Sequence, residues 1–262
     1  MTTIVMMPAM ANTHETAARQ LADARRLRRP MTRLPEEHRP KDTEEALATQ
    51  RRVMELIDEK IGGWKCSVPN GDRILIAPLP ASTVHRNSPC PIIPKGAVAE
   101  IEPEIAFFLK RDLPPRSTPY GADEVRDAIG ETRLVLEIMA SRYIDPESIT
   151  WLESLADSVK HQGMFIGPGL PDASGKPLES FHLKIEGPQG ILFDRDVKHP
   201  NEHPFRPLHW LANFLSSRSE TLQAGIVVTT GSYAGIVEVP MDTLLTFEYG
   251  SLGRFSVRFQ GI

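Results

Sequence analysis

The stretch that decides the fold runs from residue 99 to residue 109 and reads Ala99-Glu100-Ile101-Glu102-Pro103-Glu104-Ile105-Ala106-Phe107-Phe108-Leu109. Apolar and acidic residues alternate at its start, and successive side chains of a β-strand point to opposite faces of the sheet. The pattern therefore predicts a strand with one apolar face toward a core and with Glu100, Glu102 and Glu104 on the other face. Pro103 cannot donate a ladder hydrogen bond, which predicts an edge strand or a bulge at this point.

The acidic face of this strand has an electrostatic cost. Carboxylates two residues apart lie ~6.5–7 Å from one another along a strand. Each like-charge pair then costs ~0.6 kcal/mol in water and ~2.5 kcal/mol at an effective dielectric constant of 20. A half-buried acidic row needs protons, basic partners or a cation, and carboxylate oxygens suit Mg²⁺ or Mn²⁺. The alternative is an acidic strand face that is simply solvated.

A third acid favours the metal interpretation. Glu137 stands inside the otherwise apolar run Leu134-Val135-Leu136-Glu137-Ile138-Met139, and an acid in such a run is seldom buried without a partner. Glu137 either joins Glu102 and Glu104 around a metal or forms a core salt bridge, with Arg142 or Lys65 as the candidate partner.

The rest of the chain shows two kinds of sequence pattern, one before Gly63 and one after it. Residues 14–28 and 43–59 show helical spacing of apolar residues, and Asp42 precedes Glu45 by three as in a capping box. After Gly63, short apolar runs separated by Pro and Gly predict many strands, with helices near 122–129 and 205–217. We expect an α+β fold, with a helical N-terminal arm (residues 1–62) and a β-rich, mixed-sheet catalytic domain (residues 63–262).

Composition excludes several functions. The 262 residues carry a net charge of −4, so we expect neither nucleic-acid binding nor attachment to an anionic membrane. No apolar stretch approaches the ~18 residues of a membrane span, the first 15 residues make a poor signal peptide, and two cysteines form no disulfide framework. We expect a cytoplasmic protein. The basic cluster of Arg25, Arg26, Arg28 and Arg29 is interpreted as a solvated helix face.

Seven segments, taken in their order along the chain, indicate a resemblance to a known family. They are GGWKCSVP (62–69), IEPEIAFFL (101–109), LEIMASR (136–142), WLESLADSVKHQG (151–163), PLHWLANFL (207–215), LQAGIVVTTGS (222–232) and GSLGRFSVRF (250–259). With them the chain resembles the 2-keto-4-pentenoate hydratase, 2-oxohepta-3-ene-1,7-dioate hydratase and 4-oxalocrotonate decarboxylase group of the fumarylacetoacetate hydrolase superfamily. The resemblance implies a sheet roll or sandwich of that superfamily's C-terminal type and a homo-oligomer.

The resemblance also implies roles for individual residues. Glu102, Glu104 and Glu137 would bind Mg²⁺ or Mn²⁺. Lys65 would serve as an acid–base or oxyanion-stabilising group, for which we expect a lowered pKa beside the bound metal; the alternative is a purely structural bridge to Glu137. The turn Thr230-Gly231-Ser232 would hold the substrate carboxylate.

Departures from the family pattern surround the expected substrate. Lys160 and His161 stand where relatives carry a serine, Ala140 replaces an aspartate, and Ser67 replaces a glycine. We hypothesise that His161 is a substrate-facing acid–base group, and the alternative is an exposed histidine at a helix end.

The function implied is a hydratase acting on a 2-hydroxy-2,4-dienoate or 2-oxo-enoic acid, as in aromatic catabolism. A 4-oxalocrotonate-type decarboxylase, a carbon–carbon hydrolase of the acylpyruvate or fumarylacetoacetate type, and a non-catalytic relative remain open.

Overall fold

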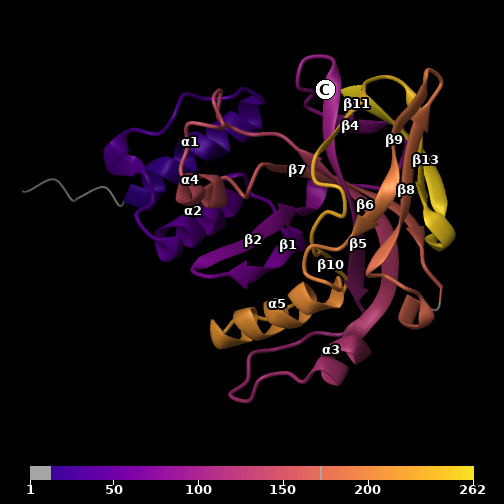
Figure 1. Ribbon diagram of the computed structural model, residues 1–262. Coiled ribbons are helices and arrows are strands. Elements are labelled where there is room, and N and C mark those ends of the chain that lie inside the picture. The colour runs from indigo at the N-terminus through magenta and orange to yellow at the C-terminus, as the bar shows by residue number, and fades with distance from the viewer. Residues whose placement is uncertain (1–12, 172) are drawn as a thin grey trace, which may run out of the picture.

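The computed structural model describes residues 13–171 and 173–262 (Figure 1). Most of the segment that we judge a poor signal peptide, residues 1–15, lies outside the described residues. The α-helices of the structure are α1 (Thr13–Leu27), α2 (Thr43–Leu56), α3 (Ala122–Ala128), α4 (Trp151–Ala156) and α5 (Phe205–Ser217). Its strands are β1 (Ile61–Asn70), β2 (Arg73–Pro80), β3 (Val84–His85), β4 (Cys90–Ile92), β5 (Val98–Leu109), β6 (Ile129–Met139), β7 (His161–Gly169), β8 (Ser180–Gly187), β9 (Gly190–Lys198), β10 (Val227–Thr229), β11 (Val237–Pro240), β12 (Leu244–Tyr249) and β13 (Arg254–Gly261).

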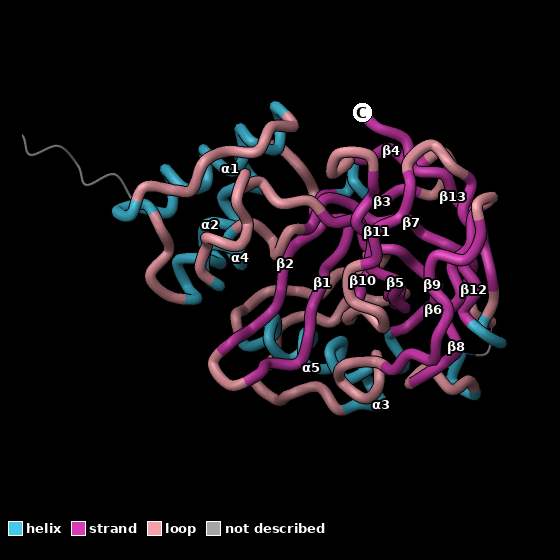
Figure 2. The backbone as a smooth tube through the Cα atoms, turned by 45° about the horizontal axis from the view of Figure 1, so that its top comes forward, coloured by secondary structure: helices cyan, strands magenta, loops and turns pink. Residues whose placement is uncertain are grey.

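The strands form two mixed sheets, so the expected α+β class agrees with the structure. The larger sheet has the order β2-β1-β10-β5-β6-β7-β3, with β11 beside β5, and the smaller has the order β4-β13-β12-β8-β9. β2 and β3 stand at opposite ends of the larger sheet, yet only the short turn Ala81–Thr83 separates them in sequence. Three residues span at most ~10 Å, so the sheet must curl until its two ends meet (Figure 2).

Curling gives the larger sheet an inner face and an outer face. One part of the inner face is filled by apolar side chains: Leu79, Ala106, Val135, Met164, Ile166 and Val227. A second core joins the outer face of β5, β6 and β7 to the smaller sheet, where Phe247, Tyr249 and Phe259 are fully buried. The acidic face of β5 lies on the inside of the roll, next to the first of these clusters.

Pro103 lies in the middle of the sheet, so the expected edge or bulge is wrong. β5 pairs with β6 without interruption past this residue. On its other side, β11 pairs with residues 98–101 and β10 with residues 106–108, which leaves a gap around the proline. The carbonyl of Pro103 accepts from the backbone N–H of Tyr233, at 3.1 Å, in the β10–β11 connection. A missing N–H is tolerated because no strand is paired there.

The helical arm packs against later sequence. Asp42 caps α2 through the backbone N–H of Glu45 at 2.8 Å, as expected, but α2 ends at Leu56 rather than at 59. Arg33, in the connection between α1 and α2, pairs with the buried Glu153 of α4 at 2.7 Å. In the described ranges, no helix has the length and apolarity that a bilayer crossing requires.

Candidate metal centre

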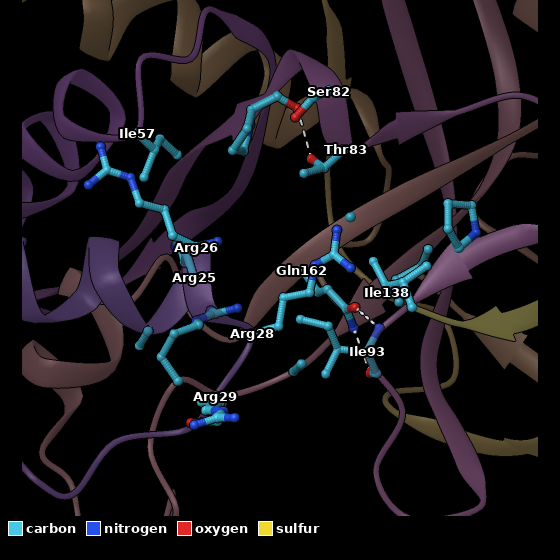
Figure 3. Close-up of a pocket in the computed structure, with 18 of the residues that line it drawn as sticks. Arg25, Arg26, Arg28, Arg29, Ile57, Ser82, Thr83, Ile93, Ile138 and Gln162 are labelled. Carbon is cyan, nitrogen blue, oxygen red and sulfur yellow. Dashed lines mark hydrogen bonds between the residues drawn. The ribbon is translucent and has the colours of Figure 1, made fainter.

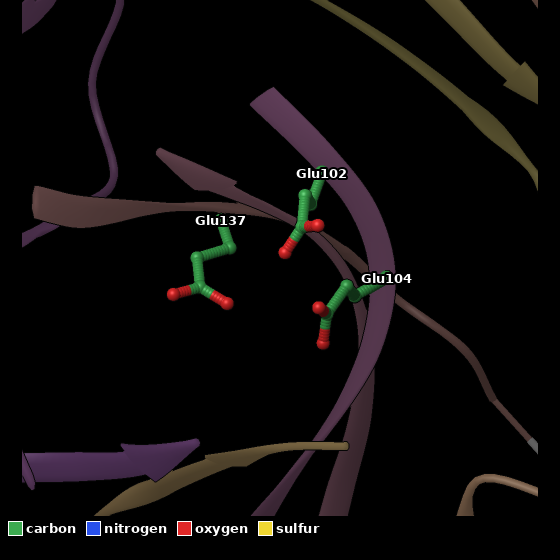
Figure 4. A group of neighbouring side chains, drawn as sticks. All are labelled: Glu102, Glu104 and Glu137. Atoms are coloured by element: carbon green, nitrogen blue, oxygen red, sulfur yellow. The ribbon is translucent and has the colours of Figure 1, made fainter. Parts of the chain in front are cut away.

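The structure brings the three predicted acids together on the inside of the rolled sheet (Figure 4). Each of Glu102, Glu104 and Glu137 offers a carboxylate oxygen, and these oxygens lie within 4.8 Å of one another. Strand register explains the convergence, because Glu102 is directly opposite Glu137 in the β5–β6 pair. Glu104 and Glu137 are each 1% exposed. Glu100 shares the face but pairs with Lys95 at the surface instead.

The three acids cannot all stay ionised at low cost in this position. Burial raises the pKa of Glu102 to about 7 and that of Glu104 to about 8, and the negative charge of Glu137 adds to both shifts. Divalent cations with a preference for oxygen ligands relieve such repulsion. One oxygen of Glu137, Oε2, is buried and has no hydrogen-bond partner among the described residues. The donor set therefore fits Mg²⁺ or Mn²⁺.

Lys65 lies beside the cluster, as expected from its position in the sequence. Its Nζ is 2.7 Å from Glu137 Oε1 and 3.1 Å from the carbonyl oxygen of Val159. Burial lowers the pKa of Lys65, but the carboxylates of Glu137 and Glu102 outweigh burial and raise it overall. Three acids thus face one ammonium group, and the lowered pKa that we expect for Lys65 beside a bound metal stays a prediction.

His161 lies against Glu137 of the acidic cluster, and its role as a substrate-facing acid–base group stays a prediction. Its side chain is 0% exposed, and Nδ1 lies 2.9 Å from Glu137 Oε1. Burial lowers its pKa to about 4, although hydrogen bonding to Glu137 acts in the opposite direction. It is not an exposed helix-end residue, because it begins β7 behind Glu137. Its geometry fits a residue that positions the Glu137 carboxylate.

In the Thr230-Gly231-Ser232 turn, two of the groups already have partners within the protein, and the role of the turn in holding a substrate carboxylate stays a prediction. The Gly231 N–H donates to Glu104 Oε2 at 2.9 Å, and the Thr230 hydroxyl is buried and donates to the Ile105 carbonyl at 3.4 Å. These two groups are engaged within the protein, and the hydroxyl of the half-buried Ser232 donates to the Gly235 carbonyl at 3.1 Å. Gly231 has a φ of +122°, which strains any other residue.

Sequence reasoning missed Thr229. Its hydroxyl donates to Glu104 Oε2, so it orients one of the three acids. Thr229 pairs with Lys65 on β1 and with Ala106 on β5. The sequence feature that could have indicated Thr229 is its place in the run VVTTGS, one residue before the expected turn. Only the pairing of β10 between β1 and β5 puts Thr229 beside the acids.

We expect Thr229→Val to weaken metal binding by about 10- to 100-fold, because outer groups that orient metal ligands contribute on that scale. The matched control is Thr230→Val, which removes a neighbouring hydroxyl whose bond goes to the backbone and should leave metal affinity within about twofold of the wild type. Titration of Mn²⁺ followed by calorimetry measures both. Equal losses in the two variants would contradict the role of Thr229.

The rolled α+β sheet with buried acids on its inside is a candidate metal centre. Comparisons with known proteins show which proteins this chain is similar to. No family model matches the chain. The chain is 26% identical over 175 residues to the 2-oxo-hept-4-ene-1,7-dioate hydratase of Escherichia coli. It is 27% identical over 161 residues to 2-keto-4-pentenoate hydratase 1 of Dechloromonas aromatica (strain RCB).

These matches cover 62% and 61% of this chain and 62% and 60% of the two relatives, so the matched stretch spans about three fifths of each curated relative. Among solved structures, 4-oxalocrotonate decarboxylase from Pseudomonas putida G7, complexed with magnesium and adipate, superposes with a TM-score of 0.77 at 19% identity. That match covers 96% of this chain and 99% of the other. The resemblance to the hydratase and decarboxylase group is thus confirmed: curated homologues are named hydratases, and the decarboxylase shares the fold.

Proposed function

We propose that this chain is a divalent-metal-dependent hydratase acting on a 2-hydroxy-2,4-dienoate or 2-oxo-enoic acid, of the kind produced in aromatic catabolism. The observation that carries the proposal is the buried cluster of Glu102, Glu104 and Glu137 with Lys65 against it. The names of the two curated relatives support the substrate class. A decarboxylase acting on a similar 2-oxo acid is the second candidate, favoured by the structural likeness to 4-oxalocrotonate decarboxylase.

Mg²⁺ or Mn²⁺ held by the three glutamates would supply a Lewis acid that stabilises the negative charge of an enolate. The rolled sheet would be the core typical of the fumarylacetoacetate hydrolase C-terminal type. We also propose a homo-oligomer, because the exposed edge strand β9 presents Ile191 and Leu192, 58% and 42% exposed, to solvent.

The protein's own residues would do the following. An ammonium group has three N–H donors, and Lys65 Nζ has two acceptors in the described structure, Glu137 Oε1 and the Val159 carbonyl. The third N–H is free to donate to a substrate oxygen or to deliver a proton to its carbon skeleton. His161 and Thr229 hold Glu137 and Glu104 in place. Buried apolar residues beneath the acids, among them Val135 and Met164, exclude water from one side.

The direct test is to add Mg²⁺ and a 2-hydroxy-2,4-dienoate and to follow the loss of its ultraviolet absorbance. Hydration gives a 4-hydroxy-2-oxo acid, whereas decarboxylation of 4-oxalocrotonate releases CO₂, so product analysis separates the two candidates. Cleavage of acetopyruvate would instead favour the carbon–carbon hydrolase. Retention of metal without turnover on any of these 2-oxo acids would contradict the enzymatic proposal.

A further inference from the structure

A cavity of about 500 Å³ lies between the end of α1 and the sheet (Figure 3). Arg25 and Arg26 from the last turn of α1 line it, together with Arg28 and Arg29 just after the helix and with Arg142. We interpreted the first four as a solvated helix face, and three of them are indeed exposed. In the structure, however, they surround a hollow of the size that small-molecule sites have, roughly 300–1,000 Å³.

This cavity is separate from the metal centre. None of the three glutamates lines it, and neither does Lys65. Ile138 does line it, and Ile138 follows Glu137 on β6, so the two side chains point to opposite faces of the sheet. The strand backbone therefore stands between the cavity and the acids, so a ligand could occupy the cavity whether or not the acids hold a metal.

The positive charge around the cavity is poorly balanced. Five arginines line it, against one acid, Glu59, among the described lining residues. Two of them, Arg25 and Arg142, share the single carboxylate of Asp157 and also both donate to the carbonyl oxygen of His161. Burial, together with repulsion from Arg142, lowers the pKa of Arg25 to about 9, and Asp157 offsets this only in part.

The two outermost arginines are free to bind a ligand. Arg28 and Arg29 are exposed, and in the described part of the chain neither has a salt bridge or a side-chain hydrogen bond. The opposite wall includes the apolar side chains of Ile93 and Ile138. In Figure 3 the four labelled arginines lie on one side of the cavity, and Ile93 and Ile138 lie on the other.

We propose that this cavity is a second ligand site, which binds a small organic oxyanion: a carboxylate or phosphate attached to an apolar body. Guanidinium groups present paired N–H donors that match the oxygens of such anions. The isoleucine wall would cover the apolar body. These arginines lie together at one cavity although the whole protein has a net charge of −4. A bound anion would reduce the electrostatic repulsion between them.

The test is calorimetric titration of phenyl phosphate into the metal-free protein, with phenol as the uncharged comparison. We expect saturable binding of phenyl phosphate that weakens as salt is raised, and much weaker binding of phenol. Arg28→Gln combined with Arg29→Gln should weaken binding by about tenfold or more, on the scale of a lost charge-assisted hydrogen bond. Arg19→Gln is the matched control, because Arg19 lies on α1 outside the cavity lining and should leave the affinity unchanged.

A second variant tests whether a large side chain that fills the cavity prevents binding. Ser82 is exposed at the cavity wall, so Ser82→Trp should fold and should block phenyl phosphate. Saturating Mg²⁺ and oxalate should leave the affinity of the wild-type protein for phenyl phosphate unchanged. Competition by oxalate, equal binding by the double arginine variant, or no saturable binding to the wild type would each overturn the proposal.

Discussion

Glu104→Gln is expected to abolish metal-dependent turnover while making the metal-free protein more stable. Losing one of three anionic ligands removes the Lewis acid from the site, and several kcal/mol of transition-state stabilisation correspond to a loss of about 1,000-fold or more. Burial raises the pKa of Glu104 to about 8, so the metal-free protein must bind a proton at this carboxyl when it folds near pH 7, and a neutral glutamine removes that cost. We therefore expect the free energy of unfolding without metal to rise by about 2 kcal/mol near pH 7.

Thermal melting with and without Mn²⁺ measures both effects. Metal should raise the Tm of the wild type, since a ligand that binds only the folded state stabilises it, and it should no longer raise the Tm of Glu104→Gln. The matched control is Glu100→Gln, which lies on the same strand face but pairs with Lys95 at the surface. A metal-induced rise in Tm that survives in Glu104→Gln would contradict the proposed ligand set.

Lys65→Met is expected to stop turnover without stopping metal binding. A positioned acid–base group contributes about 100- to 10,000-fold to rate. Among the described residues of the cluster, Lys65 hydrogen-bonds to Glu137 alone, through Oε1 at 2.7 Å. Glu137 Oε2, which has no hydrogen-bond partner in the described part of the chain, stays available to the ion. Because the substitution leaves Glu137 buried without its cation, we also expect the metal-free protein to lose about 3–5 kcal/mol of stability.

Two measurements on Lys65→Met separate catalysis from folding. Metal should restore much of the lost stability, and turnover should stay low even where melting shows the holoprotein to be folded. The control is Lys60→Met, at an exposed lysine just before β1. Wild-type turnover by folded, metal-loaded Lys65→Met would reduce Lys65 to a structural bridge.

The sequence alone determined which side chains share a face. Alternation in residues 99–105 placed Glu102 and Glu104 on one side of a strand, and the apolar run around Glu137 marked that acid as buried, because strand periodicity is a local property of the backbone. Both features agree with the structure. The α+β class followed from short apolar runs after two helical segments, for the same local reason.

Only the tertiary structure decided which faces meet. The curl that joins β2 to β3 sets Lys65 against Glu137, 72 positions later in the chain. The pairing of β10 between β1 and β5 brought in Thr229 and left the gap that accommodates Pro103. Burial of His161 and the arginine-lined cavity likewise depend on packing between distant segments. Periodicity fixes the direction of a side chain from its nearest neighbours, whereas closure of a sheet is set by the core packing of the whole chain.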